Sequence, residues 1–185
     1  MGLAIADAAA EYGADVVLVL GPVDILPENQ TVKVINVTSA GSMAHECLRR
    51  FAGCDIAILA AAVSDFTPDS VADNKIKRDD NELIIKLKPT IDIAAELGKK
   101  KKVNQILAGF ALETDNELEN AISKMKRKNL DIIVLNSLKE KGAGFGFDTN
   151  RITIIDRNNN INKFELKSKK QVARDIIEKI VSMIA

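Results

Sequence analysis

A short basic stretch contains the residue types and spacing best suited to chemistry on phosphates. Lys75, Lys77 and Arg78 place three cations in four positions of a polar segment between two predicted strands. On a mobile loop, ammonium and guanidinium groups can close over a phosphate and stabilise the negative charge that develops on it. The competing interpretation is a charged loop that faces solvent, and the residues alone leave both interpretations open.

Several positions at the ends of predicted strands add polar, small or aromatic groups. In an open α/β sheet, ligands bind beyond the carboxyl ends of the strands. Asp65 follows a long apolar run, and it either contacts a ribose or base or caps a turn. Ala60 and Ala61 either let a planar ring approach the backbone or pack against a helix. Phe110 either stacks on a base or lies in the core, and Asn136 either binds a substrate amide or satisfies a turn.

The hydrophobic pattern predicts alternating strands and helices. Short continuous apolar runs predict buried strands, and longer amphipathic segments predict helices. Strands are expected at residues 16–20, 32–37, 55–63, 83–87, 105–111 and 132–135, and helices at 2–13, 41–51, 91–98, 116–128 and 169–184. Two further apolar runs, 151–155 and 161–166, flank a turn rich in asparagine and predict an antiparallel hairpin.

This alternation predicts one α/β domain over residues 1–185. The expected fold is three-layered and Rossmann-like, with a mostly parallel sheet and a C-terminal antiparallel hairpin extension. The hairpin contains Ile152, Ile154, Ile161 and Phe164. We expect this apolar set to lie bare at the edge of the sheet, where a second subunit would cover it.

Composition and charge narrow the class of protein. Lys plus Arg and Asp plus Glu both number 26, so no global field attracts nucleic acid or an anionic membrane. The basic run 99–102 is expected to be a solvated loop. The sequence shows no signal peptide and no apolar run near ~18 residues, which predicts a cytoplasmic protein. The spacing of Cys47 and Cys54 does not match that of zinc ligands. The sequence therefore identifies no metal ligands, and any metal is expected to arrive bound to a nucleotide.

Several motifs, in order along the chain, together resemble one enzyme family. They are Met1-Gly-Leu-Ala-Ile-Ala6, Leu20-Gly-Pro22, Val37-Thr-Ser-Ala-Gly-Ser-Met43, Ala61-Ala-Val-Ser-Asp-Phe66, Lys75-Ile-Lys-Arg78, Ile91-Asp-Ile-Ala94, Gly109-Phe-Ala-Leu-Glu-Thr114, Lys128-Asn-Leu-Asp131 and Gly146-Phe-Asp-Thr-Asn150. The combination resembles the bacterial phosphopantothenoylcysteine synthetases over essentially the whole chain. In most bacteria, this family forms the C-terminal half of a fusion with the flavin-dependent phosphopantothenoylcysteine decarboxylase.

The resemblance implies a two-step ligation in coenzyme A biosynthesis. The carboxylate of 4′-phosphopantothenate attacks the α-phosphate of CTP and gives an acyl-cytidylate and pyrophosphate. The amine of L-cysteine then displaces CMP and forms an amide. The resemblance further implies Mg²⁺, a homodimer with active sites near the subunit interface, and FMN only in the fused or separate decarboxylase.

The resemblance also assigns roles to individual residues. Lys75 would be catalytic and would bind the triphosphate from the lid, and Asn136 would lie on the phosphopantothenate side. The residues expected to bind the nucleotide are Ala60, Ala61, Asp65, Lys75, Ile91, Asp92, Ile93, Ala94, Phe110, Lys124 and Lys128. The family's first strand, its glycine-rich loop and the catalytic asparagine of that loop are expected to precede Met1.

Two other classes of function compete with the ligase. A nicotinamide-dependent oxidoreductase on a similar sheet would need a Tyr-x-x-x-Lys pair, but the sole tyrosine, Tyr12, is followed four places later by Val16. The other is a non-catalytic nucleotide-binding or assembly module of the same fold. Selectivity for CTP over ATP and NADH would separate the ligase from both.

Overall fold

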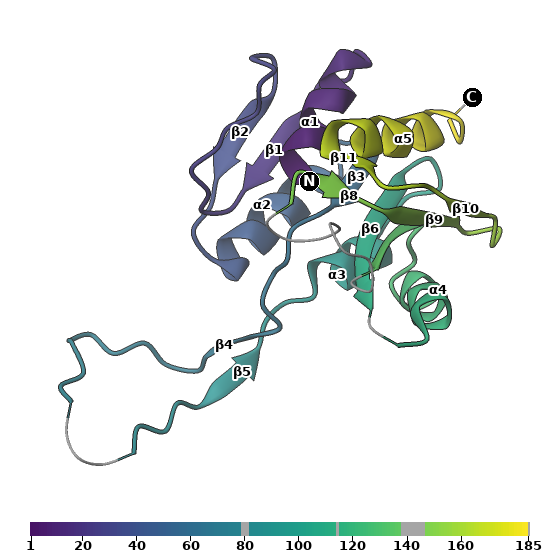
Figure 1. Ribbon diagram of the computed structural model, residues 1–185. Helices are drawn as coiled ribbons and strands as arrows, with labels where there is room; N and C mark the ends of the chain where they lie inside the picture. Colours follow the sequence, from purple (N-terminus) through teal and green to yellow (C-terminus); the bar gives the residue numbers. More distant parts are fainter. Residues whose placement is uncertain (79–81, 114, 138–146, 185) are drawn as a thin grey trace.

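The computed structural model describes residues 1–78, 82–113, 115–137 and 147–184, and it shows helices packed on a central sheet (Figure 1). The helices are α1 (Gly2–Glu11), α2 (Ala40–Phe51), α3 (Ile93–Lys100), α4 (Glu117–Arg127) and α5 (Lys169–Val181). The strands are β1 (Val17–Leu20), β2 (Lys33–Asn36), β3 (Ile56–Leu59), β4 (Phe66–Pro68), β5 (Leu87–Pro89), β6 (Ile106–Glu113), β7 (Ile132–Ser137), β8 (Thr149–Asn150), β9 (Ile152–Asp156), β10 (Ile161–Lys163) and β11 (Lys167–Ser168). None of the described helices is long and apolar enough to cross a membrane.

The central sheet has five strands in the order β10-β9-β7-β6-β3. β3, β6 and β7 are parallel neighbours, with Leu59 opposite Gly109 and Ala108 opposite Ile132. The helices α3 and α4 lie in the long connections that parallel neighbours need. β9 runs antiparallel to β7, and β10 runs antiparallel to β9. The predicted α/β fold, with a mostly parallel sheet and a C-terminal antiparallel hairpin, is therefore confirmed.

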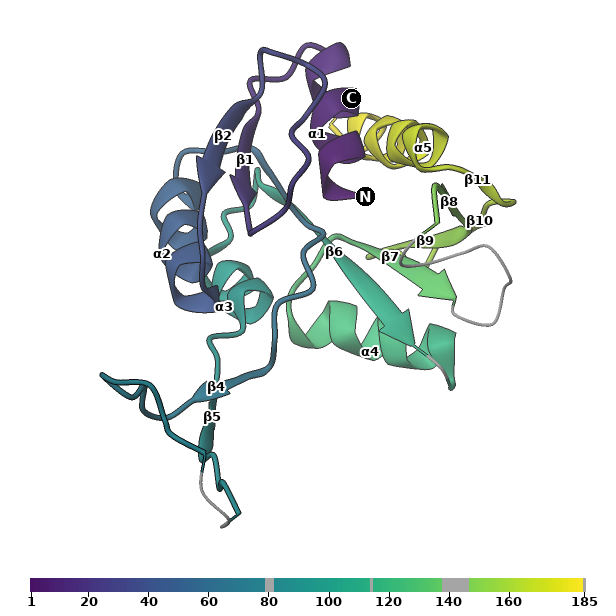
Figure 2. The same ribbon diagram turned by 60° about the vertical axis from the view of Figure 1, so that its left-hand side comes forward.

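The first two strands form a separate parallel pair. Val17 lies opposite Lys33 and Leu20 lies opposite Asn36. Within the described residues, β1 pairs only with β2, and β3 pairs only with β6. In Figure 2 the β1–β2 pair stands beside the larger sheet, and α2 leads from one to the other. The predicted parallel strands are therefore divided between two sheets.

Both faces of the central sheet are covered, because side chains alternate between two cores along each strand. On β7, Ile132 and Val134 pack in the core that contains α1 and α5. Ile133 and Leu135 pack in the core that contains residues of α2, α3 and α4. All four side chains are at most 4% exposed. A strand covered on both faces is the expected outcome of a continuous apolar run.

The C-terminal hairpin is packed more deeply than the sequence predicted. Ile152 and Ile154 are 1% and 0% exposed, because they belong to the core under α5. Phe164 also packs against that core, and Ile161 is 44% exposed. The prediction of a bare apolar edge was therefore wrong for Ile152 and Ile154. The prediction assumed that the hairpin lies beyond the helical layer, whereas α5 packs against the hairpin.

The basic run 99–102 is also more ordered than predicted. The side chain of Lys101 is 10% exposed, and its Nζ lies 2.9 Å from the carboxylate of Asp131. Lys102 Nζ donates a hydrogen bond of 2.8 Å to the carbonyl of Ala52. The prediction of a solvated loop was therefore wrong for these two lysines, whose partners are distant in the sequence.

A long arm extends from the body of the domain (Figure 1). We define the arm as residues 66–89, in which β4 and β5 pair antiparallel from Phe66 opposite Pro89 to Pro68 opposite Leu87. Of the predicted strand 83–87, only Leu87 lies in a strand, so that prediction was wrong for most of its length. The arm contains the basic stretch, and it leaves the body at the carboxyl end of β3.

Candidate nucleotide site

Asp92 is the N-cap of α3, and it has two partners at once. Its Oδ1 accepts the backbone N–H of Ala95 at 3.1 Å, which satisfies one of the amides that the first turn leaves free. Its Oδ2 lies 2.8 Å from the ammonium group of Lys128. Burial raises the pKa of Asp92, but the hydrogen bonds from Lys128 and Ala95 outweigh it and hold the pKa below its usual value. Asp92 is therefore a carboxylate at neutral pH.

Close packing of α3 on the end of α4 lets Lys128 reach Asp92. A Cβ atom at Gly98 would collide with the backbone carbonyl of Lys128, so the two segments approach where no side chain intervenes. Asn129 Nδ2 donates a hydrogen bond of 2.8 Å to the Gly98 carbonyl. The side chain of Lys128 is left 14% exposed, and it reaches from the last turn of α3 to its N-cap.

Lys124 lies one helical turn before Lys128. Residues four positions apart are neighbours on a helix surface, so α4 presents two ammonium groups on one side. Burial and then the charge of Lys128 lower the pKa of Lys124. Among the described residues, the ammonium group of Lys124 has no ion-pair or hydrogen-bond partner. It is therefore a partly buried cation that is available to an anionic ligand.

Hydrogen bonds at the base of the arm place Asp65 beside the start of α3. The backbone N–H of Thr90 donates to the carbonyl of Asp65 at 2.9 Å, and Thr90 Oγ1 donates to the carbonyl of Ser64 at 2.6 Å. These bonds tie the segment after β3 to the residues before Asp92. In the part of the chain that the structure describes, the exposed Asp65 carboxylate neither caps a turn nor pairs with a cation. It is free to accept hydrogen bonds from a ligand.

The predicted nucleotide-binding residues after β3 and around the start of α3 differ in whether their side chains are accessible to a ligand. Ile91 is 52% exposed, whereas Ile93 is 7% exposed and packs with Ala94 in the core under α3. A ligand contact from Ile93 would therefore come from its backbone. Ala60 packs partly against α1, and Ala61 is exposed. The structure thus leaves the backbone after β3 and the side chain of Ile91 accessible.

Phe110 and Asn136 lie on the opposite face of the sheet from the two lysines. Phe110 packs against the core of α1 and α5, whereas α4 covers the other face. Asn136 is two residues after Val134, and its Oδ1 accepts a hydrogen bond of 3.1 Å from Asn150 Nδ2. A ligand that contacts both Phe110 and Lys124 must therefore reach from one face of the sheet to the other.

The structure does not bring Lys75 to this cluster. Lys75 is exposed on the arm between β4 and β5, and no partner for its ammonium group lies among the described residues. Lys77 and Arg78 are also exposed, and residues 79–81 lie outside the described part. The lid and the solvated loop stay alternatives for this stretch. Thr114 and residues 138–146, which include Gly146 of the family motifs, also lie outside the part of the chain that the structure describes.

Three residues of the site were missed by sequence reasoning. Asn150 is 3% exposed and holds Asn136, and Thr90 anchors the arm. Glu113 adds a favourable charge near Lys124. A signal existed for Asn150 and Glu113, which both belong to family motifs, whereas the contacts of Thr90 depend on tertiary packing.

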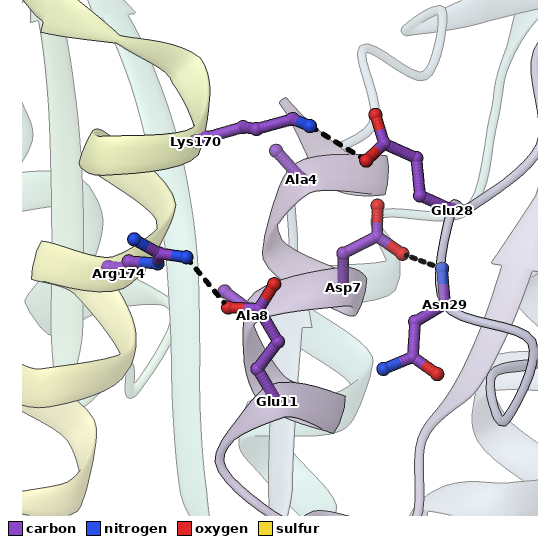
Figure 3. Close-up of a pocket in the computed structure, with 8 residues that line it drawn as sticks. All are labelled: Ala4, Asp7, Ala8, Glu11, Glu28, Asn29, Lys170 and Arg174. Atoms are coloured by element: carbon purple, nitrogen blue, oxygen red, sulfur yellow. Dashed lines mark hydrogen bonds and ion pairs between the residues drawn. The ribbon is translucent and has the colours of Figure 1, made fainter.

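The described residues contain no group of three or more His, Cys, Asp or Glu side chains suited to a metal ion. The site therefore does not fit a metal held by protein ligands alone. A cavity of about 250 Å³ lies elsewhere, between α1, α5 and the segment before β2 (Figure 3). Its walls contain the ion pairs Lys170–Glu28 at 2.7 Å and Arg174–Glu11 at 3.1 Å. Because these charges already neutralise one another, the cavity offers less to an anion than Lys124 does.

The fold and this site define a Rossmann-like α/β domain with a cationic cluster at the carboxyl end of its sheet. The chain belongs to the family described as the DNA/pantothenate metabolism flavoprotein C-terminal domain, whose family model matches residues 1–184. This confirms the resemblance to the phosphopantothenoylcysteine synthetase domain.

Similar proteins were found among both sequences and solved structures. The chain is 64% identical over 184 residues to a cysteine/cysteine sulfinic acid decarboxylase of an unknown prokaryotic organism, covering 100% of this chain and 51% of that protein. It is 43% identical over 183 residues to the coenzyme A biosynthesis bifunctional protein CoaBC of Bacillus subtilis, covering 99% and 45%. The crystal structure of the C-terminal domain of a CoaBC protein matches with a TM-score of 0.83 and 34% identity, covering 99% of this chain and 81% of that chain. The chain spans about half the length of these two curated relatives.

Proposed function

We propose that this domain is the phosphopantothenate–cysteine ligase of coenzyme A biosynthesis and that it uses CTP. Family membership and the Bacillus subtilis relative support a role in this pathway. The observation that carries the proposal is that the ammonium group of Lys128 meets Asp92 at the start of α3, with Lys124 one turn away, while the hydrogen bond from Thr90 ties the segment of Asp65 to the residues just before Asp92. The 64% identical relative is named for decarboxylation, but this chain covers 51% of it. We therefore assign decarboxylation, with its FMN, to the part of such proteins that this chain does not match.

In the first step, the phosphopantothenate carboxylate attacks the α-phosphate of CTP. A P–O bond forms to the carboxylate oxygen, the bond to the bridging oxygen breaks, and pyrophosphate leaves. Negative charge builds on the phosphates, and Lys124 and Lys128 would stabilise it from α4. Lys75 would add a third cation when the arm folds over the ligand. Mg²⁺ would enter already bound to the nucleotide phosphates, because the described residues do not form a metal site.

In the second step, the amine of cysteine attacks the acyl carbon, and CMP leaves with the electrons of the acyl–phosphate bond. This step needs a correctly placed amine and the exclusion of water, which would otherwise hydrolyse the mixed anhydride. Asn136 would orient the phosphopantothenate amide, in the geometry that its hydrogen bond with Asn150 fixes. Asp65 and the backbone at Ala60 and Ala61 would bind the cytosine, with Phe110 near the sugar or base.

Pyrophosphate release tests the proposal directly. The assay is run on this chain and, in parallel, on the same chain preceded by the matching upstream residues of the Bacillus subtilis relative. We expect release that requires CTP, Mg²⁺ and phosphopantothenate, with amide formation requiring cysteine. ATP should be at least about tenfold less effective, which corresponds to about 1.4 kcal/mol of discrimination. Absence of CTP-dependent release from both proteins, or equal use of ATP, would contradict the proposal.

We also propose a homodimer in which the arm is the main contact. The arm leaves a set of large apolar side chains at least half exposed: Phe66, Val71, Ile76, Leu83, Ile84, Ile85 and Leu87. Single exposed apolar residues are ordinary, but this many large ones on one segment are typical of an interaction surface. Sedimentation should give a species near twice the chain mass of 20.1 kDa.

A matched pair of substitutions tests the arm as the contact. Ile84 on the arm is 87% exposed, and Val103 on the body is 104% exposed. Ile84→Asp should weaken the dimer at least about tenfold, because it would bury an unpaired charge, whereas Val103→Asp should leave it unchanged. A monomeric wild-type chain, or a dimer insensitive to Ile84→Asp, would remove the arm from the interface.

A further inference from the structure

We propose that Asp92 is a positioning residue that holds the ammonium group of Lys128 in place for the nucleotide phosphates, in addition to capping α3. This inference rests on the proposed nucleotide function of the site. It differs from a direct role, because Asp92 would act through Lys128.

The geometry of Asp92 goes beyond what a helix cap requires. Capping uses Oδ1, which accepts the backbone N–H of Ala95 at 3.1 Å. The ammonium group of Lys128 lies 3.0 Å from that same oxygen and 2.8 Å from Oδ2. Both carboxylate oxygens therefore hold Lys128, whereas capping by a serine or asparagine oxygen would suffice for the helix alone.

The burial of Lys128 explains why it needs this partner. Its side chain is 14% exposed, and a buried ammonium group is unfavourable unless it is paired and hydrogen-bonded. Lys124, one turn earlier, has no such partner in the described part of the chain, and burial lowers its pKa. Asp92 thus pairs with the ammonium group of Lys128 and restricts a long flexible side chain to one position before a ligand binds. A restricted side chain loses less conformational entropy when the ligand arrives.

If Asp92 acted only through its own negative charge, its effect on nucleotide binding would be opposite to that of a positioning residue. A carboxylate close to the phosphates repels them, so its removal should strengthen nucleotide binding if it did nothing else. Positioning predicts that its removal weakens binding, because the ammonium group of Lys128 would then be mobile. The sign of the change therefore separates the two roles.

Titration calorimetry with CTP and Mg²⁺ on the full chain measures that sign. Asp92→Asn keeps an oxygen for the cap, and the carboxylate that it removes is 49% exposed, so the variant should stay folded with a smaller loss of stability than Asp131→Asn. Its affinity for CTP should fall about tenfold. Lys128→Gln should cause a similar fall, and the double variant should be no worse than Lys128→Gln alone. Glu96→Gln is the matched control, because it removes a carboxylate from α3 that pairs with Lys99 and not with Lys128. It should leave the affinity unchanged.

The results that overturn the inference are distinct from those that overturn the proposed function. Equal or tighter CTP binding by Asp92→Asn, or additive losses in the double variant, would show that Asp92 does not act through Lys128. If the wild-type chain binds no CTP, the proposed function fails instead. In that case, ¹⁵N spectra of the lysine ammonium groups in the free protein decide the inference. The Lys128 signal should be protected in the wild type and lost in Asp92→Asn, and a signal that persists in the variant would overturn it.

Discussion

Charged residues at the two ends of the central sheet have opposite environments. At the amino end, Asp131 is 2% exposed and accepts hydrogen bonds from Lys101 at 2.9 Å and from the backbone N–H of Leu107 at 2.8 Å. At the carboxyl end, the charged groups of Asp65 and Lys124 have no partner in the described residues. The residue types are the same, so charge alone does not identify a site. The absence of a partner distinguishes Asp65 and Lys124 from Asp131, whereas Lys128, which is paired with Asp92, shows that a residue of the candidate site can also be compensated.

Asp156 extends this pattern at the amino end. It lies opposite Ile132 across the sheet and accepts hydrogen bonds from Lys179 at 2.9 Å and from Asn160 at 3.0 Å. Burial raises the pKa of Asp156, but the hydrogen bonds from Lys179 and Asn160 outweigh it and lower the pKa to about 2. The amino end is therefore a region of satisfied ion pairs that contribute to folding.

The largest expected effect on stability is at Asp131. Asp131→Asn would leave the ammonium group of Lys101, which is 10% exposed, without its carboxylate. Removing one partner of a buried pair costs about 3 kcal/mol or more, and urea unfolding would measure the loss. The control is Asp15→Asn, whose pair with Lys33 is 77% and 67% exposed and should contribute about 1 kcal/mol or less. Equal losses in the two variants would contradict the assignment of Asp131 as a buried structural partner.

The sequence predicted most of the fold because its strands and helices follow local hydrophobic patterns. The runs at 105–111 and 132–135 correspond to β6 and β7, and the helix at 169–184 corresponds to α5. The arm was not predicted, because the mostly apolar segment from Leu83 to Leu87 predicts a strand whether it lies in the sheet or in an extended arm. The division between two sheets was not predicted either, since pairing between distant strands leaves no local signal.

The candidate site was predictable in its residues but not in its connections. Asp92 and Lys128 came from the family resemblance, whereas their ion pair joins residues 36 positions apart. The pair of Lys101 with Asp131 spans 30 positions, which is why the basic run looked like a solvated loop. Long-range ion pairs depend on packing such as the contact at Gly98, and that contact is not visible in the sequence.

A second, smaller effect concerns the pH dependence of stability. The pKa of Asp156 is about 2 in the folded chain and about 3.9 in an unfolded one. Because the folded pKa is lower, the stabilisation is present above about pH 4 and is lost as the pH falls toward 2. Asp156→Asn should cost about 2 kcal/mol at pH 7, and its difference from wild type should shrink at low pH. A difference that stays constant from pH 6 to pH 2 would show that this carboxylate does not stabilise the fold.

The smallest expected effect on stability is at Lys75, where the effect on turnover should be the largest. Lys75 is exposed and unpaired within the described residues, so Lys75→Gln should change the unfolding free energy by less than about 0.5 kcal/mol. Turnover should fall about 10²-fold or more, because a cation that stabilises the developing phosphate charge is lost. Pyrophosphate release and unfolding are measured side by side. Near-normal turnover would assign the basic stretch to an ordinary solvated loop.

The most direct test of the contrast between the sheet ends is a CTP titration followed by amide NMR. Resonances of residues 60–65, 91–95, 110 and 124–128 should shift with CTP and Mg²⁺. Resonances around Asp131, Asp156 and Lys101 should stay in place, because their charged groups are already paired. Shifts confined to the amino end, or no shifts at saturating CTP, would contradict the assignment of the carboxyl end as the nucleotide site.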